Sequence, residues 1–125
     1  MDFKKLLAYQ KAFELSMEIF EISKSFPKNE TYSLTDQIRR SSRSVCANMA
    51  EAYRKRDYVK HFISKLTDAD SENSETQVWI DFSFNCKYIS EETQDNLINR
   101  SLEVGKLINF MILNPEKFGV KISNI

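Results

Sequence analysis

Basic side chains are concentrated near the middle of the chain, at helical spacing. On an ideal helix of 3.6 residues per turn, Arg39, Arg43 and Arg54 point within about one third of a turn of each other. The candidate binding residues are Arg39, Arg40, Arg43, Arg54, Lys55 and Arg56. Each guanidinium offers a planar fork of donors that suits phosphate oxygens. The cluster therefore predicts a nucleic-acid-binding surface, although a charged stripe opposite an apolar seam is also typical of a solvated helix.

An acidic stripe follows later in the chain and could pair with these cations. Asp68, Glu72 and Glu75 stand at i, i+4 and i+7, which places three carboxylates on one helical face. The stripe is either a solvated face, or it meets the arginines within one subunit or across an interface. Asn48 and Glu51 lie one turn apart beside an apolar seam, where they either tie two helices together or contact a partner.

The sequence contains no recognisable catalytic or metal-binding arrangement. Carboxylate-bridged di-metal sites in helical bundles use two Glu-x-x-His pairs, whereas His61 is the single histidine and Tyr58 stands three residues before it. Cys46, His61 and Cys86 lack the paired spacing of zinc ligands. We therefore expect no enzyme activity, no metal and no cofactor. Both cysteines are expected to be reduced and partly buried, with Cys46 in the core, and His61 should lie at the surface.

Composition bounds the fold class and the compartment. The 125 residues, 42% of them hydrophobic, are enough for one domain, and two glycines with two prolines supply too few turns for a sheet protein. The 18 basic and 18 acidic side chains cancel, so a nucleic acid would have to be met by a local patch. A charged N-terminal segment and the lack of an apolar run of roughly 20 residues argue against a signal peptide and a membrane span. A cytoplasmic location is expected.

Periodicity predicts an all-α fold, an antiparallel up-down-up-down four-helix bundle. The first helix is expected over residues 3–25, capped by Asp2 and stopped at Pro27, and the second should begin behind a cap at Ser33. The first helix has a broad core-facing stripe of Leu6, Tyr9, Phe13, Leu15, Met17, Ile19, Phe20 and Ile22. The second has a narrow seam of Ile38, Ser42, Val45, Met49 and Ala52.

The later helices are delimited by further caps and a proline. The third helix should be capped by Asp57 and extend to about residue 87, and the fourth should begin behind Ser90 and stop at Pro115. We assign residues 1–114 to the bundle domain and residues 115–125 to a loosely held C-terminal tail.

The second half of the third helix carries more apolar surface than one core-facing stripe needs. Its large apolar residues spread over more than one face: Val78, Trp79, Ile80, Phe82 and Phe84. Either the fourth helix and the tail cover this surface or a second subunit does. We therefore predict an oligomer interface that includes Trp79, Phe82 and Phe84.

Many spaced positions resemble one known family. In the second helix and the turn before it these are Phe26-Pro27, Glu30, Tyr32, Leu34, Gln37, Arg39-Arg40, Ser44, Asn48 and Ala50-Glu51. Two further segments, Tyr9-Gln10-Lys11-Ala12 and Glu75-Thr76-Gln77, resemble the family's first and third helices. Over residues 6–112 the chain is similar to the four helix bundle proteins, also called 23S ribosomal RNA intervening-sequence proteins.

This resemblance implies a four-helix bundle that assembles as a homopentamer. Many members are encoded within insertions in ribosomal RNA genes. Relatives serve as accessory proteins of diversity-generating retroelements, where a basic pentamer is thought to bind nucleic acid and a reverse transcriptase. Two departures matter: Glu51-Ala52 replaces the usual Glu-Gly, so the second helix should continue smoothly, and Ala69-Asp70 replaces Gly-Ser, which adds charge.

Two functional hypotheses remain open from the sequence. The first is a non-enzymatic homo-oligomer, pentameric by resemblance, that binds ribosomal or other structured RNA, or a nucleoprotein partner, through the second helix and the loop after it. The second is a protein-interaction scaffold without nucleic-acid binding, in which the arginines serve subunit contacts.

Overall fold

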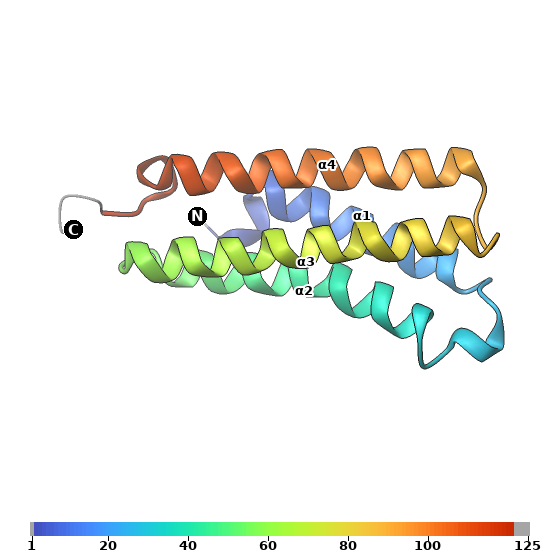
Figure 1. Ribbon diagram of the computed structural model, residues 1–125. Helices are drawn as coiled ribbons and strands as arrows, with labels where there is room; N and C mark the ends of the chain where they lie inside the picture. The colour runs from blue at the N-terminus through green and yellow to red at the C-terminus, as the bar shows by residue number, and fades with distance from the viewer. Residues whose placement is uncertain (1, 122–125) are drawn as a thin grey trace.

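The computed structural model describes residues 2–121, and every regular element in that range is a helix. The four long helices are α1 (Leu7–Ser23), α2 (Leu34–Arg54), α3 (Val59–Asn85) and α4 (Glu91–Leu113). They run alternately in opposite directions (Figure 1). Each packs on its neighbours in the chain, and α1 also contacts α4, so the four helices surround one core. The predicted antiparallel four-helix bundle is confirmed.

The core consists of two apolar clusters, one toward each end of the bundle. The first cluster includes Met49, Phe62, Leu66, Val104 and Ile108, none of which is more than 1% exposed. The second cluster is built around Ile19, Ile38, Ile80 and Leu97. The predicted α2 seam is buried throughout, because its residues recur at the helical period.

A layer of buried polar side chains separates the two clusters. The Asn73 amide donates to the Ser101 backbone carbonyl at 2.9 Å, and the Ser101 hydroxyl donates to the Asn73 side-chain oxygen at 2.9 Å. The Thr76 hydroxyl donates to the Ser41 hydroxyl at 2.8 Å. All buried side-chain polar atoms of residues 2–121 have a hydrogen-bond partner. Because each donor needs its own acceptor, this layer holds the helices in one register.

Only part of the apolar stripe predicted for the first helix is buried: Leu6, Leu15 and Ile19 are in the core as expected. Ala8, Ala12 and Leu15 are buried, whereas Phe13 and Met17, which we expected in the core, are 49% and 46% exposed. On an ideal helix these two residues lie about 100° or more around the axis from Ala12. The apolar stripe of α1 is thus wider than the face that the bundle covers, and its larger side chains are left on the outer flank toward α2.

The helix starts agree with the predictions only in part. Ser90 caps α4 as predicted, since its hydroxyl accepts from the Thr93 backbone N–H at 3.1 Å. Asp2 caps a separate 3₁₀ turn, η1 (Phe3–Lys5), because the extended backbone of Leu6 interrupts the first helix. The Asp57 prediction was wrong: Tyr58 occupies the cap position of α3, without a side-chain hydrogen bond.

Ser33 occupies the cap position of α2, as predicted, but the hydrogen bond to the first turn is accepted by a residue of the preceding turn, η2 (Lys28–Glu30). The Glu30 carboxylate accepts from the Ser33 hydroxyl and from the Leu34 backbone N–H. It also accepts from the Tyr88 hydroxyl at 2.8 Å. The pKa of Glu30 is lowered, chiefly by the Ser33 hydrogen bond and then by that of Tyr88. This carboxylate therefore links the α1–α2 turn to the segment after α3.

The C-terminal segment packs more closely than the predicted loose tail. After α4 ends beside Pro115, as expected, residues Pro115–Phe118 form a 3₁₀ turn, η3. Gly119 then adopts a left-handed backbone with φ of 86°, and Val120 is 5% exposed. Within the tail, Pro115, Phe118 and Val120 therefore pack on the core, and residues 122–125 lie outside the described residues.

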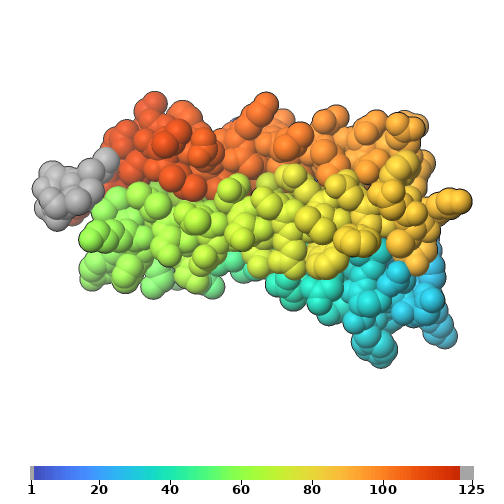
Figure 2. Space-filling view, in the orientation of Figure 1, coloured from blue at the N-terminus to red at the C-terminus, as the bar shows by residue number. Residues whose placement is uncertain are grey.

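Helices α3 and α4 lie side by side over most of the face seen in the space-filling view (Figure 2). The apolar excess of α3 is only partly covered: Ile80 is buried and Trp79 and Phe84 are half-buried, but Val78 and Phe82 are 47% and 54% exposed.

No helix within residues 2–121 is long and apolar enough to cross a membrane.

Candidate nucleic-acid interface

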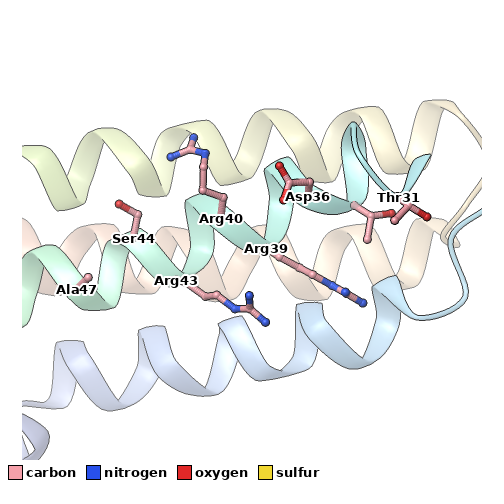
Figure 3. A pocket seen from close by; sticks show the side chains of 8 residues that line it. Thr31, Asp36, Arg39, Arg40, Arg43, Ser44 and Ala47 are labelled. Carbon is pink, nitrogen blue, oxygen red and sulfur yellow. The ribbon is translucent and has the colours of Figure 1, made fainter. Parts of the chain in front are cut away.

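Three of the predicted binding residues on α2 extend in two directions (Figure 3). Arg40 extends toward α3, whereas Arg39 and Arg43 extend toward α1 (Figure 3). Together they line an open hollow of about 500 Å³, which we call the arginine groove. Its lining residues are Thr31, Thr35, Asp36, Arg39, Arg40, Arg43, Ser44 and Ala47.

Arg39 is tied to the last turns of α1. Its Nε donates to the Ser23 hydroxyl at 2.8 Å, and an Nη donates to the Phe20 carbonyl at 3.4 Å. The guanidinium carbon also lies 4.7 Å from the centroid of the Phe20 ring. A cation at a helix C-terminus is stabilised by the exposed carbonyls there, so Arg39 joins α1 to α2 and is held in one position.

Arg40 is neutralised by the acidic stripe of α3. Its two Nη atoms lie 3.2 Å from Glu72 and 2.6 Å from Glu75, and Glu75 also accepts from the Trp79 indole at 3.3 Å. The hydrogen bond that Arg40 donates to Glu75 is the main cause of a raised Arg40 pKa. The prediction that the acidic stripe meets the arginines is thus confirmed for Arg40, within one chain. Asp68 instead lies 4.0 Å from Lys65.

Arg43 is the least engaged of the three arginines. Within residues 2–121 Arg43 forms no ion pair and no side-chain hydrogen bond. Its guanidinium carbon lies 5.7 Å from the centroid of the Phe20 ring. Its side chain is exposed. One carboxylate, Asp36, lines the same groove. Arg43 is therefore the cation of this groove that is most available to an anionic ligand.

A second hollow of about 340 Å³ continues from the arginine groove along α1. Arg43 and Ala47 line both, and we call this second hollow the apolar groove. Its apolar walls are Phe3, Tyr9, Phe13, Met17, Phe20, Cys46, Ala47 and Ala50. The sequence did not indicate this groove, because Phe13 and Met17 share the helical spacing of core residues.

The remaining predicted binding residues lie at the far end of α2, away from the arginine groove. Arg54 and Lys55 are exposed. The Arg56 guanidinium stacks 3.7 Å from the Tyr53 ring centroid, and it donates to the Tyr53 carbonyl at 2.8 Å and to the Phe118 carbonyl at 3.5 Å. Arg56 therefore holds η3 against the bundle.

Asn48 and Glu51 separate into different roles. The Asn48 amide donates to the Ser44 carbonyl at 3.0 Å, so its hydrogen bonds stay within α2. Glu51 forms an ion pair with Lys65 of α3 at 2.8 Å, and this hydrogen bond lowers the Glu51 pKa. Of the two residues, Glu51 ties adjacent helices together. The neighbouring Ala52 is fully buried and α2 continues to Arg54, so the expected smooth helix is confirmed.

The cysteines and the histidine are scattered over the bundle. Cys46 is buried, and this burial raises the pKa of its thiol to about 11. Cys86 is exposed, contrary to the expectation of partial burial, and His61 is exposed as expected. Across residues 2–121, no three His, Cys, Asp or Glu side chains are grouped so that they could hold a metal ion.

Comparisons with known proteins identify relatives of this chain. One relative is a protein of unknown function from the S23 ribosomal protein family of Bacteroides thetaiotaomicron, whose crystal structure is known. Its sequence is 29% identical to this chain. It superposes with a TM-score of 0.77, over 85% of this chain and 95% of that one. No curated protein matches. The model of the family described as 23S rRNA-intervening sequence protein matches residues 4–110. This match runs from η1 nearly to the end of α4, and the chain therefore belongs to the 23S rRNA-intervening sequence protein family.

Proposed function

We propose that this protein is a non-enzymatic, homo-oligomeric binding module that holds phosphates of structured RNA in the arginine groove. The observation that carries the proposal is the exposed Arg43 guanidinium, which has no ion pair within residues 2–121 and stands beside the fixed guanidinium of Arg39. Guanidinium groups bind phosphate oxygens through paired donors. The family description, which refers to 23S ribosomal RNA, favours RNA over other polyanions.

Self-association would compensate for the zero net charge of the protomer. A closed ring repeats the same surface on every subunit, so one Arg43 per chain becomes a circle of cations. The half-exposed Val78 and Phe82 supply an apolar contact for assembly, and the resemblance to the family points to five subunits. Ribosomal RNA, which carries many closely spaced phosphates, could then contact several subunits at once.

A protein-interaction scaffold is the second candidate. It is favoured by Arg40, which already pairs with Glu72 and Glu75. The arginines of this face therefore bind carboxylates readily, and carboxylates of a neighbouring subunit could take the place of phosphates at Arg43.

Fluorescence anisotropy with labelled 23S ribosomal RNA fragments, measured across a salt series, tests the proposal. Binding should weaken steadily with salt, because phosphate contacts release counterions. Arg43→Gln should weaken binding at low salt by about five- to tenfold for each subunit in contact with the RNA. It should reduce the salt slope by about one per such subunit, without changing the mass of the assembly. Arg100→Gln, which removes an arginine of α4 remote from the groove, is the matched control and should leave binding unchanged.

Two results would contradict the proposal. If RNA binding is undetectable, or does not change with salt, the protein does not bind RNA through phosphate contacts. Dissociation of the assembly by Arg43→Gln, with no effect on RNA, assigns the groove to the scaffold function instead.

A further inference from the structure

The apolar groove contains aromatic surface that the bundle does not use. Phe13 and Met17 are 49% and 46% exposed and belong to neither core cluster. The Phe13 ring stacks on Tyr9, with centroids 6.1 Å apart and an angle of 25° between the ring planes. These side chains line a hollow of about 340 Å³, which is within the range of about 300–1,000 Å³ typical of small-ligand sites.

The position of this aromatic surface relative to the arginines restricts what it can bind. Arg43 lines both grooves, so a group bound to its guanidinium lies at the mouth of the apolar groove. The Phe20 ring is already near two cations, Arg39 at 4.7 Å and Arg43 at 5.7 Å. Phe3 and Tyr9 are half-buried and pack on each other edge to face at 5.1 Å, whereas Phe13 is 49% exposed and so offers the most ring surface to a ligand. The combined site offers a cation for an anionic group and, directly beside it, an aromatic face for a flat apolar group.

A nucleotide carries both an anionic group, its phosphate, and a flat apolar group, its base. We infer that the apolar groove stacks an unpaired base of the RNA whose phosphate lies on Arg43, so that the substrate is single-stranded or looped RNA and not a duplex. The inference rests on the proposed function and adds the class of RNA. Bases within a duplex are stacked on each other and cannot enter such a groove, whereas unpaired bases can turn outward onto aromatic side chains.

The polar groups of the apolar groove further indicate sequence tolerance. The Ser16 hydroxyl forms a hydrogen bond with the Ser42 hydroxyl at 3.1 Å, so it already has a partner inside the bundle. The remaining walls are mainly aromatic and aliphatic, and they offer few hydrogen bonds to the edge of a base. Stacking alone discriminates weakly among bases, because every base has a π face.

The test compares three labelled RNA oligonucleotides of equal length on the full chain: a single strand, the same strand with abasic positions, and a duplex. The single strand should bind about five- to tenfold more tightly than either of the others, the low end of the effect of one stacked base. Phe13→Ala should remove that advantage and leave abasic binding unchanged. Phe13→Leu, which keeps an apolar side chain but lacks the ring, should behave in the same way.

Phe110→Ala is the matched control, since Phe110 is 46% exposed on α4 and lies outside both grooves. Equal binding of duplex and single strand, with no effect of either Phe13 variant, overturns this inference while leaving phosphate binding at Arg43 intact. A lack of binding to any of the three RNAs overturns the proposed function with it. A change of assembly mass in both Phe13 variants would instead assign the groove to a protein contact and overturn the inference.

Discussion

Three arginines that are close in sequence have three different environments, and each environment is decided by one neighbouring helix. Arg39 is positioned by Ser23 of α1, and Arg40 is positioned by carboxylates of α3. Arg43 lies near Phe20 of α1 and forms no ion pair within the described range. Exposed ion pairs contribute little to stability, typically about 0–1 kcal/mol. The functional consequence is larger: two carboxylates compensate the charge of Arg40 at the surface, which leaves Arg43 as the cation for a ligand.

At the residue scale, stability should depend on pH through Glu30. Its lowered pKa means that the carboxylate stabilises the fold above its ordinary pKa of 4.5, and that this contribution is lost as the pH falls through the folded-state value. Glu30→Gln should therefore lower the melting temperature at pH 7, and the difference from the wild type should narrow as the pH falls below 4.5. Thermal unfolding followed by circular dichroism measures this, and a difference independent of pH would contradict it.

At the element scale, the helix starts show when a local signal is sufficient. Ser90 caps α4 because its hydroxyl needs a backbone N–H only three residues away, and two glutamates follow it in the first turn. At α2 the cap comes from Glu30, which is positioned by Tyr88, 58 residues later in the chain. At α3 the nearby Asp57 makes no cap. A favourable residue type is therefore not sufficient for a cap: at α2 the bond comes from a carboxylate that a tertiary contact holds, and at α3 Asp57 stands one residue before the cap position.

This comparison predicts different costs for two similar substitutions. Ser90→Ala should destabilise the protein by about 1 kcal/mol, because it leaves a backbone donor of the first turn without its partner. Asp57→Ala, the control, should change the free energy of unfolding by less than about 0.5 kcal/mol. Urea unfolding of both variants measures the difference. Equal effects would contradict the assigned caps.

At the scale of the whole molecule, two of the exposed apolar areas lie on separate helices and bear on function. One is the α1 flank with Phe13 and Met17, and the other is the outer face of α3 with Val78 and Phe82. The α1 flank is the area that we assign to a base of the RNA, so the α3 area is the one left for a head-to-tail contact between copies. Such contacts close into rings when the rotation permits.

The α3 area should carry the subunit contact that we predicted from Trp79, Phe82 and Phe84. Light scattering should give a mass well above the 14.7 kDa of one chain. Phe82→Glu should reduce it to the single-chain mass, because a charge replaces a half-exposed ring at the contact. Helical circular dichroism should stay unchanged, which verifies folding. A wild-type mass of one chain would contradict the assembly.

Periodicity and punctuation were sufficient to predict the four helices and their order. Ile38, Val45 and Met49 of α2 recur at the helical period, and prolines or a serine cap mark the helix limits near residues 27, 90 and 115. These signals act over one or two turns of the chain and can be recognised without knowing the neighbours. The family resemblance also follows from such local spacing, and the family match confirms it.

Only the tertiary structure decided which apolar and charged side chains remain available. Phe13 and Leu15 have the same apolar character in the sequence, yet only Leu15 is buried, because a four-helix ring covers one face of α1. Likewise, Arg40 and Arg43 are equivalent until Glu75, 35 residues after Arg40, neutralises one of them. Burial and charge pairing depend on long-range contacts, which hydrophobic spacing within a single helix does not encode.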